Sequence, residues 1–447
     1  MSRKVVFISL GCDKNLVDSE KMSAGLIDAG MQITDSPAEA EICVINTCCF
    51  IHDAKQESIN SILEMAEYKE KGKLKYLIVT GCLATRYADD IKHELPEVDA
   101  ILSSSAEDEL VNAIYQLDSS KLIEKTVFKD VNSEPKLSKN RLFSPFKNYT
   151  YLKIADGCSK HCTYCVIPSI KGEYRSFPME DVINEAEDAI SRGKNELILI
   201  AQETTLYGTD IYGKKSIVDL LERLNRIDGV RWIRLLYCYP EEIDDELIDC
   251  MKRLDKVCKY IDMPIQHISD AILKTMGRRT TGKDIKDIIG RLRERIPDIV
   301  IRTSLITGFP GESEDDHRQL VEFLKEFKLD RVGVFTYSKE DGTPAARMKP
   351  QILKRVKETR RKELMLIQQG IVFERNRKLK GSILDVVIEG RLTDEDVYVG
   401  RTYRDAPDVD GCCFVKSDRE LFLGEMVKVK ILKASGYDLE ALEVKEI

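Results

Sequence analysis

Short apolar runs alternate with helical patterns over the first 118 residues of the chain. The runs lie at residues 5–10, 42–45 and 76–79, and helical patterns follow them, for example at 16–29 and 54–68. Apolar runs that alternate with amphipathic helices are typical of a parallel sheet covered by helices on both faces. Residues 1–118 are therefore predicted to form an α/β domain with a doubly wound parallel sheet.

The same alternation returns over residues 149–380. Six runs have strand character, at residues 151–155, 197–201, 232–237, 260–264, 300–306 and 332–337. A closed barrel of this kind has eight strands, so six units predict a partial, open-sided (β/α)6 barrel. A long helical pattern at 351–380 ends the region, and its many Lys and Arg residues are expected to form a solvated face.

The last region, residues 381–447, has a different pattern, with short strand candidates and no long helical segments. Its strand candidates, which turn residues separate, lie at 383–388, 397–400, 412–415 and 426–432. Short strands with frequent turns are typical of a small antiparallel β-barrel. Residues 119–148 lose the helical and strand periodicity and carry turn-forming residues, so they are predicted to be a linker.

Charge and hydropathy exclude several classes of protein. The chain has 69 Lys and Arg residues against 77 Asp and Glu residues, a formal net charge of −8, which disfavours a protein held mainly by electrostatic attachment to nucleic acid. No apolar run approaches the length that spans a bilayer, and the run at 5–10 is too short for a signal-peptide core. We expect a cytoplasmic protein, in which 13 cysteines indicate metal or redox chemistry rather than disulfides.

The strongest local motif is Cys158, Cys162 and Cys165, spaced C-x3-C-x2-C. It directly follows the first strand candidate of the partial barrel, at the end where loops build active sites. Three thiolates can hold a [4Fe–4S] cluster and leave one iron open to a substrate or cofactor. A structural zinc ion is the alternative, but it usually takes four ligands, and His161 is badly placed to be the fourth.

A second group of cysteines occupies the same position on three successive strands. Cys12, Cys48 and Cys82 each come at the carboxyl end of a strand candidate in the first domain. Such ends meet at one edge of a parallel sheet, where ligands bind. Three unrelated buried cysteines are the alternative. Cys49 could replace Cys48 as a ligand, but its side chain is expected to point elsewhere.

The Cys158 motif, with Tyr164 just before its third cysteine, resembles that of the radical S-adenosylmethionine enzymes. In that superfamily the open iron chelates S-adenosylmethionine and an electron splits it into a 5'-deoxyadenosyl radical. The resemblance implies that polar groups at other strand ends contact the cofactor. The candidate contacts are Tyr164, Gln202, Glu203, Gln266, Arg302, Ser304 and Ile306. For each of the strand-end positions a purely structural role is the alternative, and Arg278 and Arg279 are expected to be solvated surface charges.

Two tri-cysteine sites followed by a small barrel resemble the methylthiotransferases, whose small barrel is called TRAM. Residues 9–20 (SLGCDKNLVDSE) and 405–411 (DAPDVDG) are similar to the ribosomal-protein branch of that family. The resemblance implies two [4Fe–4S] clusters, S-adenosylmethionine, and an aspartate β-carbon in the twelfth protein of the small ribosomal subunit as target. It also implies an electron donor such as flavodoxin or ferredoxin. No side chain is assigned as a catalytic base, because such a C–H bond is too weak an acid.

Two other functions are alternatives. The sister branch methylthiolates an adenosine in transfer RNA, but a barrel that grips RNA should be basic. Residues 381–447 have nine Lys and Arg residues against fifteen Asp and Glu residues, a net charge of −6, which favours a basic protein substrate. A non-catalytic electron carrier would need four cysteines at each cluster, and each motif offers three.

Overall fold

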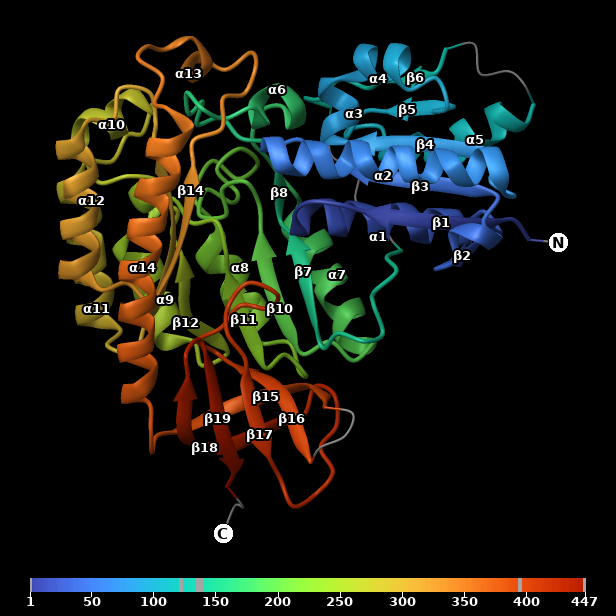
Figure 1. The fold of residues 1–447 in the computed structure, drawn as a ribbon. Coiled ribbons are helices and arrows are strands. Elements are labelled where there is room, and N and C mark those ends of the chain that lie inside the picture. The colour runs from blue at the N-terminus through green and yellow to red at the C-terminus, as the bar shows by residue number, and fades with distance from the viewer. Residues whose placement is uncertain (1, 120–123, 134–139, 393–395, 445–447) are drawn as a thin grey trace. The chain divides into compact units, whose positions relative to one another are not determined.

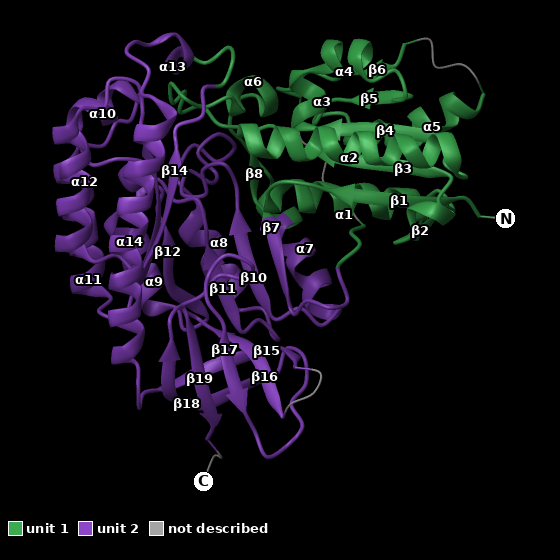
Figure 2. Ribbon diagram, in the orientation of Figure 1, with its two compact units in different colours: residues 1–143, 153–181, 340–343 green, residues 144–152, 182–339, 344–447 purple. Residues whose placement is uncertain are grey.

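The structure is a computed structural model that describes residues 2–119, 124–133, 140–392 and 396–444. The chain divides into two compact units (Figure 2). Unit 1 comprises residues 1–143, 153–181 and 340–343, and unit 2 comprises the remainder. Part of the predicted linker, residues 120–123 and 134–139, lies outside the described residues. Among the described helices, none is both long and apolar enough to cross a membrane.

Unit 1 contains a six-stranded sheet in the order β2-β1-β3-β4-β5-β6, in which every pair of neighbours is parallel (Figure 1). Its strands are β1 (Lys4–Ser9), β2 (Gln32–Thr34), β3 (Ile42–Thr47), β4 (Tyr76–Gly81), β5 (Ala100–Leu102) and β6 (Thr126–Val127). All six residues of β3 are buried, as expected for the centre of a sheet covered on both faces. The predicted parallel sheet is confirmed.

Helices connect these strands. They are α1 (Asp13–Asp28), α2 (His52–Lys71), α3 (Cys82–Arg86), α4 (Ala88–Glu94) and α5 (Leu110–Asp118), with short 3-10 turns η1 (Pro37–Glu39) and η2 (Glu107–Glu109). A later segment also belongs to unit 1. It carries α6 (Ile167–Lys171) and a hairpin of β8 (Ala155–Asp156) and β9 (Arg175–Ser176).

Unit 2 contains a second six-stranded sheet, in the order β14-β13-β12-β11-β10-β7. Its strands are β7 (Tyr149–Lys153), whose last residue belongs to unit 1, β10 (Glu196–Ile200), β11 (Trp232–Leu235), β12 (Val257–Asp262), β13 (Val300–Thr307) and β14 (Arg331–Thr336). The neighbours from β10 to β14 pair in parallel. All six predicted strands are present, and the sheet stays open between its edge strands β7 and β14, as an incomplete barrel requires.

The helices of unit 2 follow the strands in the expected alternation. They are α7 (Met179–Ser191), which begins in unit 1, α8 (Ile217–Asn225), α9 (Asp245–Arg253), α10 (Asp270–Thr275), α11 (Gly282–Arg295), α12 (Glu314–Phe327), α13 (Pro344–Arg347) and α14 (Lys354–Lys378), with the 3-10 turn η3 (Pro240–Glu242). The side chains of Ser313 and Thr281 begin α12 and α11 with capping boxes, which satisfy helix N–H groups that would otherwise lack acceptors.

The chain ends in a closed five-stranded barrel in the order β15-β16-β17-β19-β18. Its strands are β15 (Ile383–Arg391), β16 (Val397–Thr402), β17 (Cys413–Lys416), β18 (Met426–Ser435) and β19 (Asp438–Glu443). The pairings are antiparallel except that of β17 with β19, which is parallel. The predicted small barrel is confirmed, and β19 is a strand that the sequence did not predict.

Buried ion pairs attach the barrel to the sheet of unit 2. The Glu196 carboxylate in β10 accepts hydrogen bonds from Arg234 Nε (2.8 Å) and Arg401 Nη2 (2.7 Å). Burial alone would raise the pKa of Glu196, but Arg401 and Arg234 together hold it below its usual value. Tyr260 Oη of β12 donates to Asp410 (2.7 Å), so the 405–411 motif also contacts the sheet.

Candidate metal and cofactor sites

The three strand-end cysteines of unit 1 follow neighbouring strands. Cys48 comes directly after β3, Cys82 is the first residue of α3 after β4, and Cys12 precedes α1 after β1. Because β1, β3 and β4 are adjacent and parallel, their carboxyl ends lie at one edge of the sheet. Cys48 and Cys82 are buried, whereas Cys12 is exposed.

Two glycines let these loops approach one another. Gly11 has φ +91°, and a Cβ built on it would lie 2.6 Å from Cys48 Cβ and 2.8 Å from Cys48 Sγ. The backbone before Cys12 therefore rests directly against the Cys48 side chain. Gly81, also at φ +91°, has no room for a Cβ beside Asn46 Oδ1 and the Thr47 backbone. Only glycine fits both positions without strain.

Burial weakens the acidity of the two enclosed thiols, Cys48 and Cys82. It raises the pKa of Cys48, and it raises the pKa of Cys82 well above the usual value although Lys171 opposes the rise. The charge of Cys12 acts on both thiols in the same upward direction. A metal that binds here must displace the thiol protons, so binding and deprotonation are coupled. Cys49 is fully buried in the apolar core that also contains Cys82, and the choice of Cys48 as the ligand stays a prediction.

The Cys158 loop of unit 1 is closed at its base by the β8–β9 hairpin. Ala155 pairs with Ser176, and the Cys158 N–H donates to Gly172 O (3.0 Å). The Cys165 N–H donates to Cys162 O (3.0 Å), which turns the last two cysteines together. Burial raises the pKa of Cys165 to about 12.

A short helix connects the two cysteine groups. α6 begins at Ile167, just after Cys165, and contacts α3, which begins at Cys82. Val166 and Ile170 share one apolar core with Cys82, and Ser104 Oγ donates to Ile170 O (3.2 Å). All six candidate ligands therefore belong to the same compact unit.

The donor chemistry fits iron–sulfur clusters. All six candidate ligands are cysteines, whose thiolate sulfurs bind iron, and each group offers three of them, one fewer than a closed cluster needs. Within the described residues, no group of three or more Cys, His, Asp or Glu side chains is placed to hold a single metal ion. A four-iron cluster makes a different demand, because each cysteine binds its own iron and the sulfurs need not meet at one point.

In unit 2, an isolated bridge joins three of the predicted S-adenosylmethionine contacts. Gln266 adopts a left-handed backbone (φ 68°). Its N–H donates to Ser304 O (2.9 Å), and its carbonyl accepts from the Ile306 N–H (2.7 Å). The side chains of Gln266, Ser304 and Ile306 are all half-buried. The structure thus brings these three residues together at the end of β12 and along β13.

Two other candidate contacts have protein partners. Glu203 is fully buried, and its carboxylate accepts from Thr205 N (3.0 Å) and Tyr239 N (3.4 Å). Arg302 donates to Asp262 at 2.8 Å. These contacts support the structural alternative for Glu203 and Arg302. Gln202 is half-buried after β10 in unit 2, and Tyr164 is half-buried in the Cys158 loop of unit 1.

One expectation about surface charge is wrong. Arg278 is buried, because its guanidinium stacks 4.2 Å from the centre of the Tyr239 ring and donates to Pro264 O (3.0 Å). A planar guanidinium packs well on an aromatic face, and no sequence pattern signals that pairing. Arg279 is exposed, as expected.

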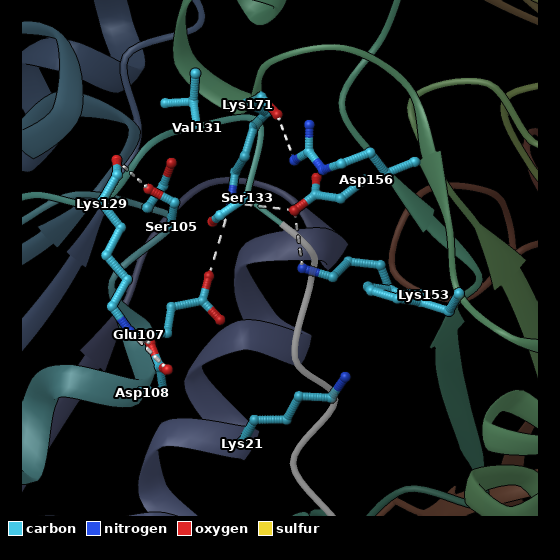
Figure 3. Close-up of a pocket in the computed structure, with 13 residues that line it drawn as sticks. Lys21, Ser105, Glu107, Asp108, Lys129, Val131, Ser133, Lys153, Asp156 and Lys171 are labelled. Atoms are coloured by element: carbon cyan, nitrogen blue, oxygen red, sulfur yellow. Dashed lines mark hydrogen bonds and ion pairs between the residues drawn. The ribbon is translucent and has the colours of Figure 1, made fainter. Parts of the chain in front are cut away.

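Unit 1 also encloses a polar cavity of about 290 Å³ (Figure 3). Lys153, Asp156, Lys171 and Glu107 extend their charged groups toward one another there. Asp18 accepts from Lys171 Nζ at 3.1 Å and also from Lys153. Cations and carboxylates thus alternate around the cavity, and the network joins α1, the β7–β8 segment and α6. The sequence singled out none of these residues.

Family models match all three regions of the chain. A family described as Uncharacterized protein family UPF0004 matches residues 4–103, the Radical SAM superfamily matches 152–324, and the TRAM domain matches 381–444. A solved radical S-adenosylmethionine methyltransferase, TsrM from Kitasatospora setae, is 15% identical with a TM-score of 0.54, over 77% of each chain. That likeness concerns the fold alone. Fold and matches together define a radical S-adenosylmethionine protein.

Curated relatives narrow the class further. Ribosomal protein uS12 methylthiotransferase RimO of Lachnoclostridium phytofermentans is 56% identical over 436 residues, which cover 98% of this chain and 99% of the relative. RimO of Acetivibrio thermocellus is 51% identical, covering 98% of each. The chain belongs to the ribosomal protein uS12 methylthiotransferase family.

Proposed function

We propose that this protein inserts a methylthio group at the β-carbon of an aspartate in ribosomal protein uS12, in the cytoplasm. The observation that carries the proposal is the placement of two incomplete cysteine sites in one compact unit, joined by the α3–α6 contact. A four-iron cluster held by three cysteines would have one iron without a protein ligand. A protein that only carries electrons has no need of such an open iron.

Six residues would hold the two clusters. Cys158, Cys162 and Cys165 form one site, and Cys12, Cys48 and Cys82 form the other. When bound, the clusters and S-adenosylmethionine would supply the radical and the methyl group and would carry the sulfur, which no side chain can do.

The residues of the chain position the clusters and S-adenosylmethionine. The β8–β9 hairpin closes the Cys158 loop, and the bridge of Gln266 to β13 presents polar edges for S-adenosylmethionine. Glu312 orders the turn that follows β13, because its carboxylate accepts hydrogen bonds from the N–H groups of Gly308 and Phe309. We propose that Gln266, Ser304, Ile306 and Gln202 contact the cofactor, and that Tyr164 of the Cys158 loop is a further contact.

The charge of the barrel supports a protein substrate. A net charge of −6 over residues 381–447 repels phosphate and attracts a basic ribosomal protein. The electron donor would be a small reductant of the flavodoxin or ferredoxin type. Methylthiolation of transfer RNA is the second candidate, and the same acidic surface disfavours it.

The test is direct. The clusters are reconstituted anaerobically, and the protein is incubated with S-adenosylmethionine, a sulfur source, a reductant, and either small ribosomal subunits or transfer RNA. Mass spectrometry should find the methylthio mass on an aspartyl peptide of uS12 and none on nucleosides. Modification of transfer RNA alone would overturn the proposal.

A further inference from the structure

Asn15 of α1 lies where the cysteine-bearing loops of unit 1 meet. Its side chain is buried, with 1% of its surface exposed. Its Nδ2 donates to Leu10 O (3.0 Å), in the segment that leads to the first cysteine, and to Thr47 O (3.0 Å), directly before the second. Each of the two amide hydrogens of Asn15 is therefore donated to a different loop.

The other end of the same amide faces the third cysteine. The Cys82 thiol donates to Asn15 Oδ1, with a sulfur–oxygen distance of 4.0 Å. Because Nδ2 makes two hydrogen bonds to carbonyls, the orientation of the amide is fixed, and its oxygen must point toward Cys82. One side chain thus contacts all three loops.

The backbone of Asn15 is anchored as well. Asn46 Nδ2 of β3 donates to Asn15 O (2.9 Å) and to Ser19 Oγ (3.0 Å). Ser19 Oγ in turn lies 2.8 Å from Asn15 O, to which it can donate, and 2.8 Å from Ser9 Oγ of β1, whose hydroxyl can donate to it. Asn15 therefore cannot shift without disturbing the ends of β1 and β3.

We propose that Asn15 is a positioning residue that holds the three loops in one arrangement before iron arrives. The inference rests on the proposed second cluster. Loops from three strands that were free to move would each lose conformational freedom on binding iron, and a fixed cross-link removes part of that cost. Aspartate lacks the two donors, and glutamine is longer by one methylene, so neither side chain can make all three contacts.

The test uses a chain in which Cys158, Cys162 and Cys165 are all replaced by alanine, so that only the site of Cys12, Cys48 and Cys82 remains. Asn15→Ala and Asn15→Asp are introduced into this background. Asn376→Asp is the matched control.

The control residue has the same chemistry in another place. Asn376 of α14 is also 1% exposed, and its Nδ2 also donates to two backbone carbonyls, Gly436 O (3.1 Å) and Tyr437 O (3.0 Å). Loss of its donors should destabilise the fold by a similar amount without touching a cysteine loop.

Iron and sulfide are measured after anaerobic reconstitution, followed by the rate of iron loss to a chelator and the electron paramagnetic resonance spectrum of the reduced cluster. Asn15→Ala should lose iron roughly 10- to 100-fold faster than the parent, the usual scale for residues that orient metal ligands, with an altered spectrum. Asn376→Asp should match the parent in both. Equal chelation rates and spectra for Asn15→Ala and the parent would overturn the inference. A parent that binds no iron would instead overturn the proposed second cluster.

Discussion

The Asp18 carboxylate accepts a hydrogen bond from Lys171 Nζ at 3.1 Å, and both side chains are at most 5% exposed. Asp18 lies in α1, the helix that follows Cys12, and Lys171 ends α6, the helix that follows Cys165. This ion pair therefore joins the helices next to the two cysteine sites. Asp18 also accepts from Lys153, so one buried carboxylate pairs with two buried cations.

Replacement of this carboxylate should loosen unit 1. Asp18→Asn leaves Lys153 and Lys171 in a buried site with less negative charge, at a cost of about 3 kcal/mol. Hydrogen exchange in peptides from α1 and α6 should accelerate accordingly. Asp245→Asn is the control, because Asp245 pairs with Arg295 at an exposed site, and such pairs contribute about 1 kcal/mol or less. Unchanged exchange in both helices would contradict the prediction.

Gly11 should tolerate no side chain. In Gly11→Ala the new methyl group would lie 2.6 Å from Cys48 Cβ, in a backbone conformation (φ +91°) that alanine disfavours. Gly30→Ala is the matched control, since Gly30 has φ +83° and nothing within 4 Å of a built Cβ. Both variants should lose about 1 kcal/mol to backbone strain, but only Gly11→Ala should fail to assemble the second cluster, measured as iron per chain. Full iron content in Gly11→Ala would contradict the close packing of the two loops.

Variants of the two cysteine sites should separate two activities. Cys158→Ala should abolish the cleavage of S-adenosylmethionine to 5'-deoxyadenosine, measured by liquid chromatography. Cys12→Ala should still cleave it but insert no methylthio group. Cys250→Ala removes a buried cysteine of α9 and should retain both activities. If Cys12→Ala kept full methylthiolation, the assignment of two clusters would be wrong.

The stability of unit 1 should fall as the pH rises. Burial, and then the charge of Asp18, raises the pKa of Glu107 from 4.5 to about 8. Between these values the folded chain holds a proton that the unfolded chain has released, so this contribution is complete below pH 4.5 and is lost through pH 8. Because about a quarter of the Glu107 side chain is exposed, the effect should be on the order of 1 kcal/mol.

Thermal unfolding from pH 5 to pH 9 tests this dependence. Glu107→Gln stays neutral throughout, so it should gain stability relative to the parent as the pH rises. Glu67→Gln, which changes an exposed side chain of α2, should show a constant difference. A constant difference for Glu107→Gln too would exclude the proposed titration.

The sequence predicted helices and strands where the run of apolar residues was long enough to show a periodicity. All six strands of the second sheet came from runs of five residues or more, whereas β2, β5 and β6 have two or three residues each and give no measurable pattern. The strand β19 (Asp438–Glu443) was missed because its sequence, DLEALE, is acidic and rich in helix formers. Its pairing with β17 and β18 overrides that local preference.

The candidate site was predictable where it depended on position along a strand. The placement of Cys12, Cys48 and Cys82 at neighbouring strand ends followed from the alternation alone. The role of Asn15 did not, because its acceptors Leu10 and Thr47 come together only in the folded sheet. Likewise, residues 153–181 come at the end of the first strand of the second sheet but pack within unit 1. Contacts with residues distant in the chain decide this packing, so no local sequence pattern predicts it.

Cys12 is the exposed member of its group, and this asymmetry has a practical consequence. Dissolved oxygen and peroxide attack accessible sulfur first. A preparation handled in air should therefore become sulfenylated at this residue while the enclosed Cys48 and Cys82 remain reduced. If such a sample were then reconstituted anaerobically, it would still cleave S-adenosylmethionine at the Cys158 site yet form no methylthio product, so an assay that follows cofactor cleavage alone would overstate the competent fraction.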